Sequence, residues 1–255
     1  IKMYKALYES LNAPAVWLLN KIGVSTGYKM AQEFGLPVKK SDKNLALALG
    51  GMTNGVSPLQ MARAYSVFAS GGKLPTAHFI TKIVDFSGHE VKRKKSLTTK
   101  RVLKKSVATE MTSMMIDVFK LGTGKTAKPS GYTLAGKTGS TNSGIKENDS
   151  DRDKWVVGYT PDVVVATWEG YDDTTATQQL SDVETKSINY LYKAEMKKLL
   201  PTTAGTSFSV TDAATKANST TKTPKKNLLE QAGEVANNVK KGFSQAWSSV
   251  RSLFQ

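Results

Sequence analysis

The chain has 255 residues, 39% of them hydrophobic, so it can bury a sizeable core in one large domain or two small ones. It contains no cysteine, which excludes disulfides, thiolate metal sites and cysteine nucleophiles, and no apolar run approaches the ~20 residues of a membrane span. The net charge of +15 favours an anionic neighbour, but the lysines are scattered without a nucleic-acid-binding motif, so we expect no nucleic acid partner.

The chain begins at Ile1 in a stretch that reads as the middle of a longer sequence, so we expect a fragment. Residues 2–9 are predicted to be helical, and Pro14 disfavours helical geometry just before it. "NAPAVWLLNKIG" predicts a second helix, with Asn12 as a possible cap and Gly23 at its end. Ser10 and Asn12 therefore fall at a joint between two helices. Short polar side chains at such a joint either project into a cleft or cap the end of a helix.

The middle of the chain carries two further helix patterns. "GVSPLQMARAYSVFASGG" is the clearest, because Ser57 can cap it, Pro58 opens it and two glycines end it. "FITKIVDFSGHEVKR" predicts a hairpin around Ser87 and Gly88. "SVATEMTSMMIDVFKLGTG" predicts a helix whose methionine stripe is more typical of core packing than of a cofactor site.

"YTLAGKT" alternates as a strand does, and a polar loop is expected from Thr141 to Lys154. "KWVVGYT" and "VVVATWEGY" predict two more strands, and a helix over residues 182–199 closes the globular part. Residues 201–226 form a low-complexity linker with too little apolar content to fold. Residues 227–255 carry an amphipathic helix pattern, which leaves open a docked or partly disordered tail and contact with a membrane surface.

The decisive stretch is "GYTLAGKTGS", residues 131–140, which satisfies the phosphate-loop formula G-x-x-x-x-G-K-[ST]. That mechanism needs a strand before the first glycine and a helix starting at the Lys-Thr. Here a polar segment with Pro129 precedes the motif, and "GSTNSG" follows it, which favours turns. The context therefore argues against a phosphate loop, which remains the alternative interpretation.

The remaining candidates for chemistry are serine and lysine. The two histidines, His78 and His89, have no evident acid–base partner, so we expect neither a Ser-His-Asp site nor a metal, and no cofactor. Lys-Thr-Gly accompanies two serine motifs in penicillin-binding proteins and β-lactamases, in the order S-x-x-K, S-x-N, K-T-G. S-x-N occurs at Ser10, Ser140 and Ser187, and only Ser10 precedes Lys-Thr-Gly at an interhelical joint.

With "SLNAPAVWLLNKIG", "LALGGMTNGVSPLQMARAYSVFASGG", "GKTGST" and "WVVGYTPDVVVATWEGYDD", residues 1–200 resemble the C-terminal part of the transpeptidase domain of class A (bifunctional) penicillin-binding proteins. The resemblance implies a mixed α/β fold, an antiparallel sheet between helical layers, here N-terminally incomplete. It implies D,D-transpeptidase acyl transfer between peptidoglycan stem peptides, binding of β-lactams, and a location at the outer face of the bacterial plasma membrane. The anchor, and a glycosyltransferase domain, would lie outside this chain.

The same resemblance suggests a role for each matching residue. Ser10 relays a proton to the departing amine, Asn12 holds a peptide amide, and Lys137 supplies positive charge. The hydroxyls of Thr138 and Ser140 bind the substrate carboxylate, and the backbone N–H of Ser140 is one oxyanion donor. Gly139 lets the substrate backbone lie against the strand. Ser140 stands where Thr is more usual, which keeps the hydroxyl.

The family's nucleophile, the serine of S-x-x-K at a helix N-terminus, is not evident. Three S-x-x-K strings start at Ser70, Ser143 and Ser219, which we place at a helix end, in a loop and in the linker. A helix C-terminus opposes a developing oxyanion. We therefore expect the nucleophile outside this chain and the chain alone to be inactive. A β-lactamase is disfavoured because no base for a deacylating water is identifiable, and a non-enzymatic wall-binding module remains a further alternative.

Overall fold

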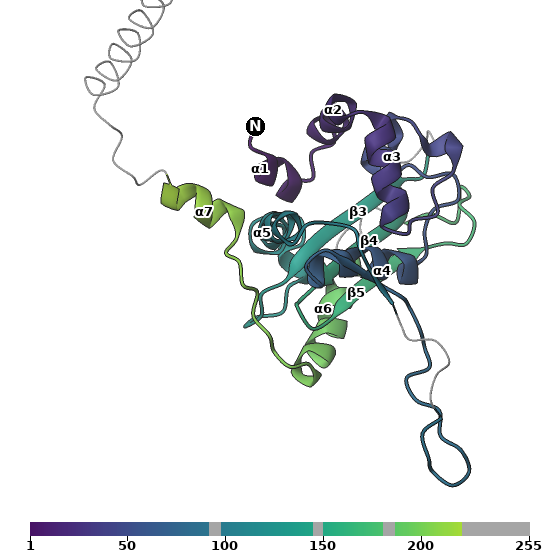
Figure 1. Ribbon diagram of the computed structural model, residues 1–255. Coiled ribbons are helices and arrows are strands. Elements are labelled where there is room, and N and C mark those ends of the chain that lie inside the picture. Colours follow the sequence, from purple (N-terminus) through teal and green to yellow (C-terminus); the bar gives the residue numbers. More distant parts are fainter. Residues whose placement is uncertain (92–97, 145–149, 181–186, 221–255) are drawn as a thin grey trace, which may run out of the picture. The chain divides into compact units, whose positions relative to one another are not determined.

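The computed structural model describes residues 1–91, 98–144, 150–180 and 187–220. The chain divides into a compact unit of residues 1–215 and a second unit of residues 216–255, of which only the start is described. Figure 1 shows the elements. They are α1 (Met3–Tyr8), α2 (Asn12–Ile22), α3 (Val24–Glu33), η1 (Lys40–Asp42), η2 (Leu45–Leu49), α4 (Pro58–Ala69), β1 (Lys73–Pro75), β2 (Thr99–Arg101), α5 (Lys105–Lys120), η3 (Lys125–Ala127), β3 (Ala135–Asn142), β4 (Asp151–Tyr159), β5 (Val164–Gly170), α6 (Ser187–Leu199), η5 (Leu200–Thr202) and α7 (Ala213–Thr220).

The first two predicted helices are confirmed as α1 and α2, and Ser10 lies at the joint between them. The prediction that Asn12 caps the second helix is wrong. Asn12 is already the first residue of α2, Leu11 occupies the cap position, and no side chain caps this end. The side chain of Asn12 is therefore not used by the helix end, and it is exposed.

Helix α4 forms where its sequence signals place it. The Ser57 hydroxyl accepts from the backbone N–H of Gln60, whose side chain in turn accepts from the backbone N–H of Ser57, so the two form a capping box. Pro58 occupies the first turn, where it costs no hydrogen bond. Gly71 and Gly72 follow the helix with φ of 63° and 99°, a conformation that glycine adopts most readily.

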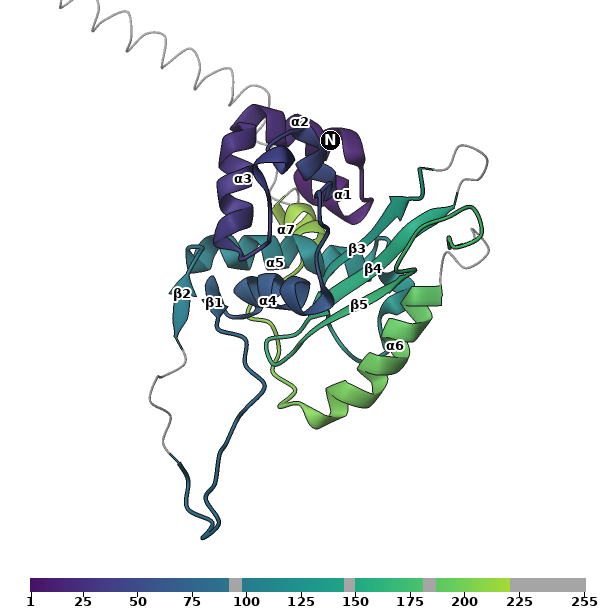
Figure 2. The same ribbon diagram turned by 90° about the vertical axis from the view of Figure 1, so that its right-hand side faces the viewer.

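A three-stranded antiparallel sheet, in the order β3-β4-β5, forms the centre of the first unit. Gly139 on β3 is paired with Trp155 on β4, which is paired with Trp168 on β5. Helices α4 and α5 lie on one side of this sheet and α6 on the other, as Figure 2 shows. This confirms the predicted antiparallel sheet between helical layers. Strand β3 has no neighbouring strand on its other side among the described residues.

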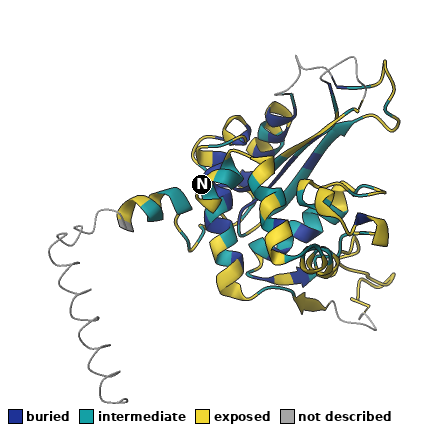
Figure 3. Ribbon diagram, turned by 90° about the horizontal axis from the view of Figure 1, so that it is seen from above, coloured by how far each residue is buried: buried dark blue, intermediate teal, exposed yellow. Residues whose placement is uncertain are grey.

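The buried residues gather on the sheet and on the sides of the helices that face it (Figure 3). One buried cluster lies between the sheet and α6, and residues of α5 and β4 contribute to it. It consists of Val118, Phe119, Ala127, Leu134, Val156, Ile188, Tyr192, Met196 and Leu200. On the other side of the sheet, Tyr159 packs with residues of α5 and stacks on Phe68 of α4. The Tyr159 hydroxyl also pairs with the hydroxyl of Thr112 at 2.8 Å, which fixes α5 to the end of β4.

Three local predictions need correction. The hairpin expected from Phe79 onward turns at Gly88, but in its described part, up to Val91, it contains no strands and only one bridge, between Val84 and Glu90. It projects from the rest of the unit (Figures 1 and 2), and the segment therefore gains little packing for strand formation. Strand β3 begins at Ala135, after rather than at the tyrosine of "YTLAGKT". The loop predicted from Thr141 to Lys154 is shorter, because β3 and β4 both extend into it.

The expectation that residues 201–226 have too little apolar content to fold is wrong for the described part. Phe208 and Val210 pack against the cluster around Tyr159, and α7 follows. The few apolar residues suffice because the body of the domain supplies the other half of the contact. Helix α6 is described from Ser187, and the start predicted for it, like the tail at residues 227–255, lies outside the described residues.

Candidate active site

Ser10 stands at the joint between α1 and α2 in a strained backbone conformation. Its φ is 58°, and among the described residues it is the only non-glycine residue with positive φ. A non-glycine residue held in this region costs roughly 1–3 kcal/mol and is found mostly where function or packing demands it. The joint thus holds the Ser10 hydroxyl in a fixed direction instead of letting the helix continue.

That hydroxyl points to the sheet. The Nζ atom of Lys137, on strand β3, donates a hydrogen bond to Ser10 Oγ at 2.6 Å and a second to the carbonyl oxygen of Thr138 at 2.8 Å. Two sequence motifs, 127 residues apart, therefore meet in one hydrogen bond. Burial lowers the pKa of Lys137 to about 8, because a less hydrated site disfavours the ammonium form. A lysine with this pKa can both supply charge and exchange a proton near neutral pH.

The next residues of β3 continue along the edge of the sheet. Thr138 is half-buried and its hydroxyl pairs with that of Thr123, whereas Gly139 and Ser140 are exposed. Within the described residues, the side chains of Ser140 and Asn12 have no hydrogen-bond partner. Both are available to a ligand, and both line one cleft.

The cleft has a volume of about 1530 Å³ and brings together all six residues predicted for the site. Its polar side comes from the α1–α2 joint and β3. Its apolar side comes from α2, η2, α4 and α5, with Trp17, Leu49, Tyr65, Met111 and Met114. A cleft that joins a few convergent polar groups to an apolar wall is the usual form of a small-molecule or peptide site.

Three residues of the site were not predicted from the sequence. Thr123, just after α5, shares a hydrogen bond between its hydroxyl and that of Thr138. Its backbone N–H donates to the carbonyl oxygen of Tyr8 at 3.2 Å. Asn189 on α6 donates to Thr123 and so supports it from behind. Trp155 lines the cleft beside Gly139. Asn189 belongs to the third S-x-N triplet of the sequence, a pattern that could have indicated it as a site residue. No sequence pattern indicates Thr123.

The three S-x-x-K serines lie elsewhere, and none lines the cleft. Ser70 is the C-terminal cap residue of α4, and its hydroxyl bonds the carbonyl of Lys73. Ser143 follows β3 as predicted. Ser219 lies within α7, not in an unfolded linker. Their positions do not provide a hydroxyl next to Lys137.

The Lys-Thr pair of the phosphate-loop formula lies inside strand β3, and no helix starts there. The backbone N–H groups that would have to converge on a phosphate are instead part of an extended strand. The phosphate-loop interpretation is therefore not supported.

Comparison with known proteins identifies the family. Residues 1–189 match the family described as the penicillin-binding protein transpeptidase domain. The chain is 40% identical over 213 residues to penicillin-binding protein 2a of Streptococcus pneumoniae, covering 84% of this chain and 29% of that protein. It is 42% identical over 181 residues to penicillin-binding protein 1F of Bacillus subtilis, covering 71% of this chain and 24% of that protein. The chain thus spans less than a third of the length of these relatives.

Among solved structures, the penicillin-binding protein PonA1 from Mycobacterium tuberculosis aligns with a TM-score of 0.65 at 24% identity, over 81% of this chain and 58% of that one. The chain belongs to the penicillin-binding protein transpeptidase family.

Proposed function

We propose that this chain forms the substrate cleft of a serine-type D,D-transpeptidase that cross-links peptidoglycan stem peptides. The observation that carries the proposal is the hydrogen bond from Lys137 to Ser10 at the edge strand β3. It is supported by the edge of β3 that has no neighbouring strand among the described residues, along which an extended peptide can bind by backbone hydrogen bonds.

In this proposal, a nucleophilic serine attacks the carbonyl carbon of the D-Ala-D-Ala bond. As the C–N bond breaks, the proton of the attacking serine passes through the Ser10 hydroxyl to the nitrogen of the departing D-alanine. An amine of a second strand then attacks the acyl carbon, the C–O bond to the serine breaks, and the proton of that amine returns to the serine oxygen. Ser10 suits the relay because Lys137 donates to its oxygen, which leaves the Ser10 proton free to be given. No S-x-x-K serine of this chain lines the cleft, so we propose that the chain alone forms no acyl-enzyme.

The other residues bind the donor peptide. Lys137 and the hydroxyls of Thr138 and Ser140 form a positive, hydrogen-bonding end of the cleft that suits the terminal carboxylate. Thr138 can still donate, because a hydroxyl that accepts from Thr123 keeps its own proton. Asn12 holds a peptide amide. β-Lactams enter the same cleft because they present a carboxylate and a reactive amide in a similar arrangement.

We place the whole enzyme at the outer face of the bacterial plasma membrane, where its stem-peptide substrates are. None of the described helices is both long and apolar enough to cross a bilayer. The net charge of +15 suits contact with an anionic membrane surface or wall polymer. A glycosyltransferase domain in the same enzyme belongs to this proposal as well.

The test is release of D-alanine from a stem pentapeptide ending in D-Ala-D-Ala, by the full-length gene product. Ser10→Ala and Lys137→Met are each expected to slow release by at least ~100-fold, as for loss of a general acid–base group. Ser70→Ala is the matched control and should leave the rate unchanged. Unchanged release in the Lys137→Met variant would refute the assignment, and wall-polymer binding without any release would favour a wall-binding module.

A further inference from the structure

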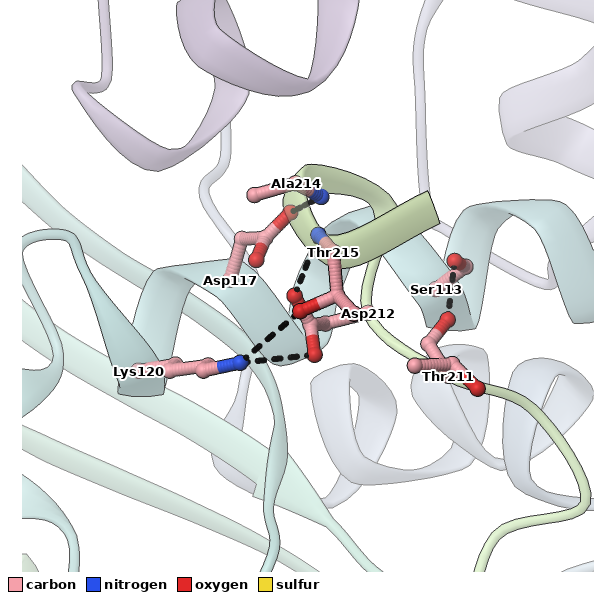
Figure 4. A network of polar contacts seen from close by, with 7 residues as sticks. All are labelled: Ser113, Asp117, Lys120, Thr211, Asp212, Ala214 and Thr215. Atoms are coloured by element: carbon pink, nitrogen blue, oxygen red, sulfur yellow. Dashed lines mark hydrogen bonds and ion pairs between the residues drawn. The ribbon is translucent and has the colours of Figure 1, made fainter. Parts of the chain in front are cut away.

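The C-terminal part of the first unit lies against helix α5. We call residues 206–215 the C-terminal strap. It is held by apolar contacts of Phe208 and Val210 with the Tyr159 cluster. The Thr206 backbone N–H donates to Asp162 at 2.8 Å, and the Ser113 hydroxyl donates to the Thr211 carbonyl. The strap then reaches the buried polar group drawn in Figure 4.

This polar group joins α5 to the strap through two carboxyl groups and one lysine. Asp117, on α5, is fully buried and accepts a hydrogen bond from the Ala214 backbone N–H at 2.9 Å. Asp212, on the strap, accepts from Lys120 Nζ at 2.8 Å and from the Thr215 backbone N–H at 2.9 Å. One oxygen of Asp117, Oδ1, is buried without a hydrogen-bond partner among the described residues. A buried carboxylate oxygen in this position calls for a proton or a donor.

The charges in this group do not balance when both acids are ionised. Asp117, Asp212 and Lys120 then carry a net charge of −1 at a contact where both carboxyl groups are buried and the lysine is exposed, whereas a proton on Asp117 makes the trio neutral. The other elements packed against α5 carry Lys5 on α1, which pairs at 3.7 Å with Glu9 just after that helix, Arg63 on α4, Lys125 on η3 and Lys137 on β3. The charged groups that act on Asp117 are Asp212 and Lys120.

Burial raises the pKa of Asp117 to about 6, and the neighbouring Asp212 adds to that rise. Partial burial opposes ionisation of Asp212 too, but the hydrogen bonds from Lys120 and Thr215 outweigh it and lower its pKa to about 2. Below about pH 6, Asp117 therefore keeps its proton in the docked state while Asp212 is ionised. Because Asp212 is on the strap and Asp117 on the body, ionisation of both places like charges across the contact.

We propose that the C-terminal strap is a pH-sensitive latch, held on α5 while Asp117 is protonated and loosened when Asp117 ionises. The docked-state pKa lies above the ordinary value of 3.8, so the extra stability is full below about 3.8 and is lost as the pH rises to about 6. The same helix that carries Asp117 contributes Met111 and Met114 to the cleft wall. The latch thus acts on an element of the site, and it does not depend on the proposed function.

The test is residue-level hydrogen exchange of the 255-residue chain from pH 4 to pH 7, with rates corrected to protection factors. Protection of the Ala214 amide is expected to fall ~10- to 100-fold over this range, as a shift of about two pKa units requires. The Val157 amide, in the central strand, is the internal reference for global unfolding and should not follow. Unchanged protection of Ala214 between pH 4 and pH 7 overturns the proposal.

Two variants assign the titration. Asp117→Asn has the shape of the protonated acid, so its Ala214 protection should be independent of pH and as high at pH 7 as in the unmodified chain at pH 4. Ser113→Ala is the matched control, because it removes a strap hydrogen bond without a titrating group. It should lower protection by the same factor at every pH. A pH response in Asp117→Asn equal to that of the unmodified chain would overturn the role of Asp117. If Asp117→Asn does not fold, the pH dependence of Ala214 protection in the unmodified chain and in Ser113→Ala still tests the proposal.

Discussion

Gly139→Ala separates a role in substrate binding from a role in folding. A methyl group at Gly139 would meet only the Cβ of Trp155 among the described residues, at an ordinary contact distance of 3.7 Å. Since alanine also restricts the unfolded chain, the free energy of unfolding should be unchanged or raised by up to ~1 kcal/mol. Thermal unfolding should therefore shift upward by no more than about 4 °C.

Acylation should respond differently. The added methyl group stands on the edge strand where the donor peptide is proposed to lie, so penicillin acylation of the full-length gene product should fall by at least ~10-fold, or 1.4 kcal/mol. The assay is the rate of labelling by a fluorescent penicillin, read beside thermal unfolding. Gly158→Ala is the matched control, because its methyl group would overlap the Tyr192 hydroxyl and meet the Phe119 ring at 2.9 Å. Overpacking of this kind should cost ~1–3 kcal/mol of stability. Unaltered acylation in Gly139→Ala, or a loss of stability as large as in Gly158→Ala, refutes the reasoning.

Four further predictions follow from the same site and core. Ser140→Ala should slow penicillin acylation by roughly 10- to 150-fold, from the ~1.5–3 kcal/mol of a hydrogen bond to a charged acceptor. Ser140→Thr should leave the acylation rate nearly unchanged, because the hydroxyl is kept. With a substrate whose carboxylate is esterified, Ser140→Ala should slow acylation much less, so equal slowing with the acid and the ester would contradict the carboxylate role. Because burial lowers the pKa of Lys137 to about 8, the second-order acylation rate should fall as the pH rises through about 8; a flat profile from pH 7 to pH 9 would count against a charged Lys137. Phe119→Ala, at a fully buried position, should lower the free energy of unfolding by ~3–5 kcal/mol in chemical denaturation, and a loss below 1 kcal/mol would mean that the cluster is not the core. Finally, the 255-residue chain alone should show no covalent penicillin adduct by intact mass, and stable labelling at any S-x-x-K serine would overturn that expectation.

The elements that could be predicted are those whose ends are determined by residues close by in the sequence. The capping box at Ser57 and the proline after it fixed one end of α4. Pro14 lies in the first turn of α2, but Ala13 before it is helical, so the break that puts Ser10 at a joint comes earlier than Pro14 indicated. The alternation of "YTLAGKT" predicted that Lys-Thr-Gly lies on a strand, although it did not show that the strand extends through Asn142. Each of these depends on backbone chemistry within a few residues, which a single sequence displays.

The parts that could not be predicted depend on partners far away in the sequence. Thr123 joins the site only because α5 ends next to β3 and α1, and nothing near Thr123 announces this. The C-terminal strap looked unable to fold because composition counts only its own apolar residues. Phe208 is enough when Tyr159 and α4 provide the rest of the contact. For the projecting segment around Gly88 the error was the opposite one. Strands were predicted from its residue types, but these residues project from the unit and gain little packing.

The central claim is that the cleft between Ser10 and β3 binds the acyl donor. The most direct measurement is a crystal structure of the full-length gene product after reaction with benzylpenicillin. The account predicts that the opened antibiotic lies along the edge of β3, with its carboxylate at the Thr138 and Ser140 hydroxyls and Lys137 still bonded to Ser10. An antibiotic bound outside this cleft, or attached to Ser70, Ser143 or Ser219, would contradict it.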